Sequence, residues 1–406
     1  MTATQSAAAV RCASALSISP STNDAVTEVI QRASTALGGV ADLAVVFVSH
    51  HHAPQLEAML VQLREQLGPR HLIGCTGESI VGVGQEIELS PAISLWLAQL
   101  PGCDIRPLRI EFAPNREGGT FHVVPKNWSH ALPDDATMLL LGEPYSFPAD
   151  GWFERLSDEL PRLPIIGGMA SGAFQPRRNA VFQDDQALVT GAVGVCISGA
   201  VQIDSVVSQG CRPIGRPMIV TKAEGNVLQE VAGKPPLVQL REMYETLTPE
   251  EQQLIQQGLH VGVVIDEYQE NFTRGSFLIR NCMGVDRSTG AMVVGDYLRR
   301  GQTVQFHIRD ARSADEDLRE LLGSKVDRAG APPSGGLLFT CNGRGSRLFS
   351  EPHHDAAAIG ALAGEIPLAG FFAQGEMGPI GGKNFLHGFT ASTAFFRSKL
   401  PTSQGK

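Results

Sequence analysis

The sequence has no excess of basic residues. Its 33 Lys and Arg are outnumbered by 42 Asp and Glu, and the formal net charge at pH 7 is −9. Proteins that bind nucleic acid or an anionic membrane surface need a positive excess to neutralise phosphate groups. We therefore expect neither a nucleic acid nor a membrane among the partners of this chain.

Cysteine is scarce, and long apolar runs are absent. The seven cysteines are scattered, their number is odd, and no two form a CxxC motif. This pattern excludes a disulfide framework and a zinc knuckle, and it is typical of reduced thiols in a cytoplasm. No apolar run approaches the roughly 18 residues that cross a membrane. We expect a cytoplasmic protein that is folded from about residue 10, with a capped helix at residues 21–37, rather than a transit peptide.

Signatures of common enzyme classes are also missing. The segment "MGPIGGKN" has Met377 and Asn384 where a phosphate-binding Walker A loop requires Gly and Ser or Thr. No G-x-G-x-x-G follows a strand, so a dinucleotide site has no support. The segments "GESIV" and "MASGA" do not fit the G-x-S-x-G elbow of serine hydrolases, and we interpret Ser79 and Ser171 as turn hydroxyls.

Glycine is abundant instead, and it is concentrated near the C-terminus. Residues 368–388, "LAGFFAQGEMGPIGGKNFLHG", include six glycines among 21 residues. Such a density marks backbone that turns tightly or approaches another group closely. Glu376, Asn384 and His387 stand among these glycines and could face a ligand.

Three segments of the chain repeat one pattern. Each has an apolar strand, a helix, a second strand that ends in glycine, and a further strand, and the first two copies are offset by 93 residues, from Asp42 to Asp135 and from Gly74 to Gly167. The third copy begins at Gly336. This order predicts an α/β fold (mixed α+β) of repeated strand–helix–strand–strand units, forming mixed sheets flanked by helices in two interlocked modules.

The length of 406 residues favours two modules rather than one core. We expect the first at residues 1–210, with two copies, and the second at residues 211–406, with an insert and the third copy. The insert predicts a hairpin at 217–235, a helix at 237–247, a helix capped by Thr248, and three consecutive strands.

Each copy places a glycine loop after its second strand, at residues 74–79, 167–172 and 370–384. Open α/β sheets place ligands at the carboxyl ends of their strands. We therefore expect that the three loops could converge on one cleft.

A cysteine nucleophile stays open as an alternative. Cys75 and Cys341 each end a predicted strand beside glycine, and Arg344 would favour a thiolate at Cys341. His387 or His353 could act as a base. Buried, inert cysteine is the commoner fate, so we expect no catalytic residue.

Histidines cluster at residues 50–52 and 353–354. Neighbouring residues on an extended chain point to opposite sides, so at most alternate ones could share a metal, and no HExxH is present. We expect solvated loop histidines, no metal and no cofactor. A single axial histidine for haem, His387 first, stays an alternative.

The charged residues of the glycine loops predict a pocket for an amino-acid-like zwitterion. Arg344 and Asn342 would take an anionic group, and Glu376 a cationic one. The alternative is an Arg–Glu pair that only ties loops together in an interaction scaffold. The candidate ligand-binding residues are Cys75, Glu78, Ser171, Cys341, Asn342, Arg344, Glu376, Asn384 and His387.

Several motifs resemble the FIST domain family, both its N-terminal and its C-terminal module. They are "IGCTGESIVG", "GGMASG", "KAEGNVLQEVAGKPPL", "FLIRNCMGVD", "LLFTCNGRGSRLF" and "PLAGFFAQGEMGPIGGKNFLHGFTAS". The resemblance implies an intracellular sensory protein that binds small ligands such as amino acids and acts through a signalling partner. It also implies two other roles within the family, haem-based gas sensing and, in relatives with an F-box, ubiquitin ligase adaptors. A fold that starts near residue 10 leaves no room for an F-box, and no fused kinase, cyclase or DNA-binding segment is expected.

Overall fold

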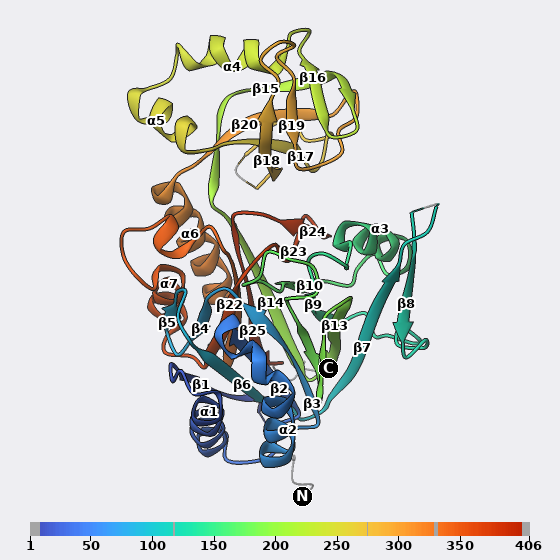
Figure 1. Cartoon of the computed structure of the whole chain (residues 1–406), viewed down its shortest axis with the longest axis vertical. Helices are drawn as coiled ribbons and strands as arrows, with labels where there is room; N and C mark the ends of the chain where they lie inside the picture. The colour runs from blue at the N-terminus through green and yellow to red at the C-terminus, as the bar shows by residue number, and fades with distance from the viewer. Residues whose placement is uncertain (1–8, 117, 274, 329–331, 400–406) are drawn as a thin grey trace, which may run out of the picture. The chain divides into compact units, whose positions relative to one another are not determined.

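A computed structural model describes residues 9–116, 118–273, 275–328 and 332–399. The fold is a mixed α/β fold with several mixed sheets, as the sequence predicted. It divides into unit 1 (Met1–Val207, Arg319–Leu386 and Thr390–Lys406) and unit 2 (Ser208–Leu318 and His387–Phe389). The third repeat copy therefore lies in the same unit as the first two (Figure 1). Within these described ranges, no helix is long and apolar enough to cross a membrane.

The first sheet of unit 1 has six strands. From one edge of the sheet to the other, they are β1 (Arg11–Ser17), β6 (Ile93–Gln99), β2 (Leu43–Ser49), β3 (His71–Gly77), β11 (Val181–Gln183) and β12 (Gln186–Leu188). The helices of this copy are α1 (Thr22–Leu37), η1 (His50–Gln55) and α2 (Leu56–Leu67). Helix α1 begins where the sequence predicted, because the Ser21 side chain accepts the Asp24 N–H and caps the first turn.

The second sheet has seven strands. From edge to edge, they are β24 (Lys383–His387), β23 (Glu376–Ile380), β10 (Ile165–Met169), β9 (Thr137–Gly142), β13 (Ala192–Gly199), β7 (Cys103–Ala113) and β8 (Thr120–Val124). Helix α3 (Ala149–Glu159) buries Trp152 and Phe153 in the core that covers this sheet.

The third sheet again has six strands. They are β14 (Val201–Gln209), β25 (Thr390–Ser398), β21 (Gly335–Cys341), β22 (Leu368–Ala373), β4 (Ile80–Gly82) and β5 (Gln85–Ile87). The helices near it in sequence are α6 (Ala311–Arg328), η2 (Gly345–Arg347) and α7 (His354–Ala363).

The predicted repeat is confirmed by an identical close contact in each copy. The parallel pairs match Val46 with Gly74, Leu140 with Gly167, and Leu338 with Gly370. A Cβ atom on these glycines would lie 2.1, 1.8 and 1.9 Å from the carbonyl oxygen of the partner. Only glycine allows the backbones to approach this closely.

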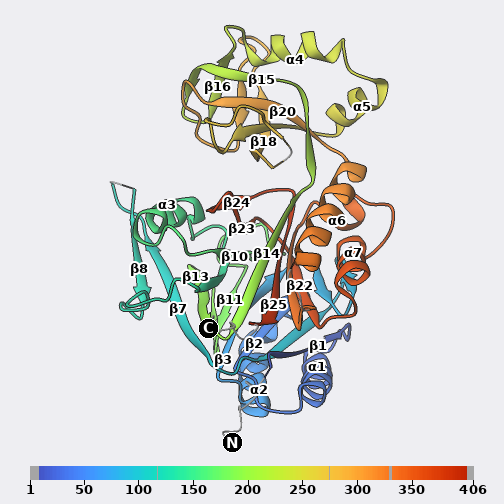
Figure 2. The same ribbon diagram turned by 180° about the vertical axis from the view of Figure 1, so that it is seen from behind.

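The three sheets exchange hairpins. Hairpin β4–β5 follows the second strand of copy one but pairs with β22 of copy three, and β11–β12 follows the second strand of copy two but pairs with β3 of copy one. Hairpin β23–β24 follows the second strand of copy three and pairs with β10 of copy two. Figure 2 shows β3 and β11 from behind. Each sheet is thus completed by another copy, which interlocks the three.

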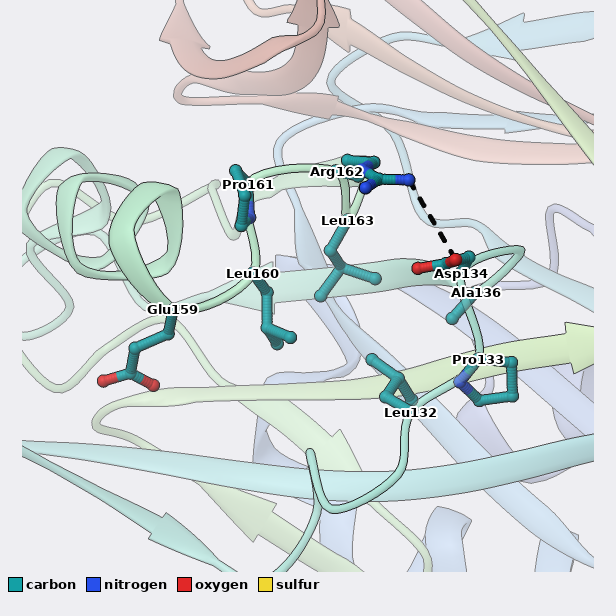
Figure 3. Close-up of a pocket in the computed structure, with 9 residues that line it drawn as sticks. All are labelled: Leu132, Pro133, Asp134, Ala136, Glu159, Leu160, Pro161, Arg162 and Leu163. Atoms are coloured by element: carbon teal, nitrogen blue, oxygen red, sulfur yellow. Dashed lines mark ion pairs between the residues drawn. The ribbon is translucent and has the colours of Figure 1, made fainter.

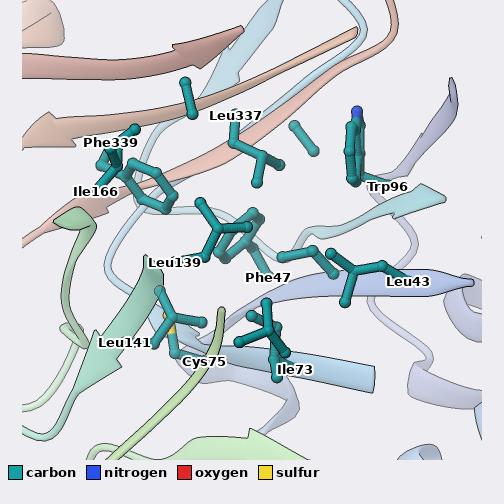
Figure 4. Packing of buried hydrophobic residues seen from close by; sticks show 14 of the residues in the cluster. Leu43, Phe47, Ile73, Cys75, Trp96, Leu139, Leu141, Ile166, Leu337 and Phe339 are labelled. Atoms are coloured by element: carbon teal, nitrogen blue, oxygen red, sulfur yellow. The ribbon is translucent and has the colours of Figure 1, made fainter. Parts of the chain in front are cut away.

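The inner faces of the three sheets share one apolar core. Figure 4 shows Phe47 from the first sheet, Leu139 from the second and Phe339 from the third in this core. The rings of Phe47 and Phe371 stack at 5.1 Å, and Phe339 meets Phe371 edge-on at 5.9 Å. Such aromatic contacts add about 0.5–1.5 kcal/mol each to the burial of apolar area.

Unit 2 contains a closed barrel of six strands, and it also includes the first part of α6. In barrel order the strands are β15 (Cys211–Glu224), β16 (Val227–Val231), β19 (Met292–Val294), β18 (Phe277–Val285), β17 (Leu259–Val264) and β20 (Thr303–Arg309). Helices α4 (Pro236–Tyr244) and α5 (Pro249–Gln257) also belong to this unit. The predicted capping box is confirmed, since Thr248 and Glu251 each accept the other's backbone N–H.

Candidate functional site

The glycine loops of the three copies meet at one buried residue of unit 1. Ser171, from copy two, is fully buried. Its Oγ accepts the Glu78 N–H of copy one at 2.8 Å and donates to the Phe372 carbonyl of copy three. Its own N–H donates to the Thr76 carbonyl at 3.0 Å. Ser171 therefore connects the three loops, and its hydroxyl group forms two of the connecting hydrogen bonds.

A buried ion pair lies beside this junction. Arg344 and Asp355 have side-chain exposures of 0% and 1%, and Arg344 Nε and Nη2 each donate to one carboxylate oxygen at 2.7 Å. Thr340 Oγ1 also donates to Asp355, at 2.6 Å. Burial alone would raise the pKa of Asp355, but the charge and hydrogen bonds of Arg344, with those of its other partners, hold it well below its usual range.

Two aromatic rings, Phe349 and His354, pack next to this ion pair. The Phe349 ring lies 5.1 Å from the Arg344 guanidinium, and His354 stacks on Phe349 at 3.4 Å. His354 Nδ1 is 2.9 Å from Asp355. The stacking and the bidentate contact together hold the guanidinium in one orientation.

Two further carboxyl groups are buried near Arg344. Glu86, on the exchanged hairpin β4–β5, accepts the Ala356 N–H of α7 at 2.9 Å. Glu376, on β23, accepts the backbone N–H and the hydroxyl of Thr390 at 3.1 and 2.8 Å. Burial raises the pKa of each to about 8, and for Glu86 the negative charge of Asp355 adds to the rise. Both are therefore largely protonated at neutral pH.

Four buried polar atoms of this region have no hydrogen-bond partner of normal geometry within the described residues. They are Glu86 Oε2, Asn342 Oδ1, Arg344 Nη1 and Glu376 Oε1. The Cys341 thiol interacts with the Glu376 carboxyl and lowers its pKa somewhat. We call Glu86, Cys341, Asn342, Arg344, Asp355 and Glu376 together the Arg344 centre. Buried groups without a partner are rare in folded proteins, and they mark places for water or a ligand.

A polar cover joins copy three to copy one next to the centre. Arg347 donates to both oxygens of Glu78, at 2.7 and 3.1 Å, and to the Asn342 carbonyl at 2.7 Å. The Ser346 N–H and hydroxyl both donate to Glu88. The Arg347 side chain is 46% exposed, so this contact, unlike the Arg344–Asp355 pair, can rearrange at low cost.

The structure places the sequence-predicted residues in different surroundings. It brings Cys341, Asn342, Arg344 and Glu376 together in the centre, and Glu78 and Ser171 beside it. Cys75 lies in the apolar core of unit 1, where burial raises its pKa. Asn384 accepts the Ile165 N–H and donates to the Leu163 carbonyl, both at 2.8 Å. His387 is 4% exposed and is assigned to unit 2.

Two acidic residues of the centre were not predicted. Asp355 follows the two histidines at 353–354, which the sequence predicted to be solvated loop residues, and its place at the start of α7 was the available signal. Glu86 approaches α7 only through the exchanged hairpin, and no sequence pattern indicates that contact.

The other proposed ligand sites have weaker support from the geometry. In the part of the chain that the structure describes, no group of three His, Cys, Asp or Glu is arranged to hold a metal. His52 is buried and bonds to Thr22 Oγ1 at 2.9 Å. His353 Nδ1 lies 3.0 Å from the Glu86 backbone nitrogen. These histidines have structural contacts.

Hollows in unit 1 lie at both ends of the second sheet. One of about 220 Å³ lies at the amino ends of β9 and β10, and Figure 3 shows it lined by Leu132, Leu160 and Leu163. Its rim carries an exposed ion pair, Arg162 to Asp134, at 4.0 Å. Two more, of about 290 and 420 Å³, are both lined by Pro144, Phe147 and Pro148, which follow β9. The largely apolar linings of these two hollows give a ligand few polar anchors.

Comparisons with known proteins agree with the motif resemblance. The FIST N domain matches residues 42–234 and the FIST C domain matches residues 240–379. An uncharacterized protein of Mycobacterium tuberculosis is 43% identical over 382 residues, which cover 94% of this chain and 98% of the relative. An uncharacterized protein of Mycobacterium bovis is 40% identical over 378 residues, which cover 93% and 96%. FIST domains are generally small-ligand-binding sensory domains. The Arg344 centre takes Glu86 from the first matched region and Arg344 and Glu376 from the second, and the chain belongs to the FIST family.

Proposed function

We propose that this chain is a sensory protein whose small, amino-acid-like ligand binds at the Arg344 centre. The observation that carries the proposal is a group of buried polar atoms on Asn342, Arg344, Glu86 and Glu376 that have no hydrogen-bond partner among the residues the structure describes. A scaffold that only sealed its loops would be expected to satisfy these atoms within the protein. In a family whose domains bind small ligands, a ligand is the group that best supplies their missing partners.

The chemistry of the free atoms fits a zwitterion better than a simple anion. Arg344 Nη1 is a donor and suits one oxygen of a ligand carboxylate, whereas Asn342 Oδ1 is an acceptor and suits an ammonium group. Asp355 already neutralises the charge of Arg344. A ligand without net charge therefore adds no unbalanced charge to a buried site.

Ligand binding is coupled to proton release by Glu86 and Glu376. Glu86 and Glu376 are largely neutral at pH 7, because burial raises their pKa to about 8. A ligand ammonium group beside them favours the ionised form and lowers that pKa. Binding of such a ligand would thus release protons and would tighten as the pH rises towards 8.

The polar cover could transmit the ligand-bound state of the centre to the protein surface. A ligand shifts a conformation only through its different affinity for the two states. The Arg347–Glu78 contact joins copies three and one, is partly exposed, and lies close in sequence to Arg344. Its rearrangement on ligand binding would alter a surface that a partner protein reads. We propose that output passes to a partner protein rather than through catalysis by this chain.

The experiment is a thermal-shift screen with amino acids and close derivatives. We expect a subset to raise the Tm of the wild-type protein, since a ligand at 100 times its Kd stabilises by about 2.7 kcal/mol. The shift should be lost in Asn342→Ala and kept in Asn127→Ala, which changes an exposed asparagine of the same unit. Shifts of equal size in both variants, or none in the wild type, would contradict the proposal.

A further inference from the structure

Cys341 has surroundings that differ from those of most other cysteines in the chain. It ends β21, is partly exposed, and its Sγ accepts the Gly343 N–H at 3.4 Å. Burial raises the pKa of five others, namely Cys12, Cys75, Cys103, Cys196 and Cys282. Because the thiolate is the reactive form of cysteine, these five are poor nucleophiles at neutral pH.

Two guanidinium groups act on Cys341. Burial lowers the pKa of Arg344, but the charge and hydrogen bonds of Asp355 raise it, and a negative charge on Cys341 adds to the rise. The hydrogen bond from Arg347 to Glu78 raises the pKa of Arg347 against the effect of burial, and Cys341 again contributes. Since such interactions are mutual, both cations favour the Cys341 thiolate.

The carboxyl group that interacts with Cys341 is a proton donor rather than a negative charge at neutral pH. Glu376 is wholly buried, and its pKa of about 8 keeps it largely protonated although the thiol and Arg344 tend to lower that value. Arg344 keeps Nη1 without a partner among the described residues and is completely buried. The thiol thus has a cation, a free N–H donor and an acid around it, a set of groups that can support the displacement of an oxygen leaving group.

We propose that Cys341 is an oxidation site that reacts with hydroperoxides and becomes a sulfenic acid. The thiolate attacks one peroxide oxygen, so that the S–O bond forms and the O–O bond breaks. Two electrons pass from sulfur to the departing oxygen, which takes a proton from Glu376 and leaves as water or an alcohol. Glu376 then recovers the proton that the thiol released. Arg344 Nη1 would donate a hydrogen bond to the peroxide. This reaction needs no amino-acid-like ligand, so it can hold or fail independently of the sensory proposal.

The test treats the full-length protein with hydrogen peroxide and traps sulfenic acid with a dimedone-type probe. Peptide mass spectrometry then assigns the labelled residue. We expect Cys341 to be labelled about tenfold faster than any other cysteine, because two guanidinium groups favour its thiolate, whereas burial disfavours the thiolate of the five others. Treatment with a thiol reductant after the peroxide and before the probe should abolish the label. Labelling of Cys341 no faster than that of the core residue Cys75 would overturn the proposal.

The role of the guanidinium groups is tested by the pH profile of labelling. In Arg347→Gln the pH of half-maximal rate should rise, whereas better access of peroxide alone would raise the rate at every pH without moving that midpoint. Arg155→Gln is the matched control, since Arg155 is 40% exposed and also pairs with a glutamate, Glu159. An unchanged midpoint in Arg347→Gln would remove the electrostatic basis of the proposal. Glu376→Gln should slow labelling several-fold at neutral pH, and an unchanged rate would exclude Glu376 as the acid.

Discussion

Replacing Glu376 by Gln should change the way in which the stability of unit 1 depends on pH. Burial raises the pKa of Glu376 and of Glu86 from 4.5 to about 8. A carboxyl group whose pKa is raised on folding holds a proton that the unfolded chain releases. Its contribution to stability is therefore fully present below pH 4.5 and is lost as the pH rises through 8.

The expected magnitude follows from proton linkage. Each proton held only by the folded state lowers the free energy of unfolding by about 1.4 kcal/mol per pH unit. Together the two glutamates should contribute a slope of roughly −2.7 kcal/mol per pH unit between about pH 5 and 7.5. Histidines whose folded pKa is lowered by burial oppose this slope below about pH 6.5 in wild type and variant alike. In Glu376→Gln the slope should therefore be less negative than in the wild type by about 1.4 kcal/mol per pH unit.

Urea denaturation followed by tryptophan fluorescence measures these slopes. The three tryptophans, Trp96, Trp128 and Trp152, are all buried in unit 1 and report on its unfolding. The control is Glu159→Gln, a change of a carboxylate that is 48% exposed on α3, and it should leave the slope as in the wild type. Equal slopes in Glu376→Gln and wild type would show that Glu376 is not a buried, protonated acid.

Three further predictions concern packing and capping. Arg344→Met should cost about 3–5 kcal/mol in urea denaturation, because it leaves Asp355 buried without its cation; a loss below about 1 kcal/mol would count against the buried pair. Gly370→Ala should lower the Tm strongly, since its Cβ would lie 1.9 Å from a carbonyl oxygen, whereas Gly360→Ala, with open space around it in α7, should raise stability by up to about 1 kcal/mol. Equal effects of the two would be inconsistent with the close strand contact. Thr248→Ala should destabilise unit 2 by about 1 kcal/mol through loss of the α5 cap, and calorimetry without a shift in that transition would disprove it.

The repeated fold could be predicted because its signals are local. Apolar strands, amphipathic helices and the glycine that ends each second strand recur at similar spacing, and caps such as Ser21 and Thr248 mark helix starts. The exchange of hairpins could not be predicted in this way. The short strands β4 and β11 are apolar and largely buried, and such a pattern does not indicate which strand lies alongside.

The candidate site could be predicted in part for the same reason. Arg344 and Glu376 are charged residues within glycine loops, and the structure brings them into one centre. Glu86 escaped notice because its contact with Ala356 spans 270 positions. Cys75 was selected for its place beside glycine, yet a strand that is buried on both faces turns it into the apolar core. Whether any of the candidate residues touches a ligand stays a prediction.

The residues that follow the first strands share one feature in the three copies. After β2, β9 and β21, a buried polar atom is left without a partner among the described residues, namely His50 Nδ1, Glu143 Oε1 and Asn342 Oδ1. In copy three this position stands next to the Arg344–Asp355 pair. In each copy, the carboxyl end of the first strand thus provides a polar group that is unpaired within the described ranges. Copy three adds the charges that would select a ligand.

Binding of a ligand at the Arg344 centre can be tested by a high-resolution crystal structure of the full-length protein, as purified and after soaking with the amino acids that raise its Tm. We expect density for a bound molecule other than water, in hydrogen-bond contact with Arg344 Nη1 and with Glu376 Oε1 or Asn342 Oδ1. Density for water alone at these atoms, or side chains that pair with one another and leave no space, even after soaking, would contradict ligand binding at this centre.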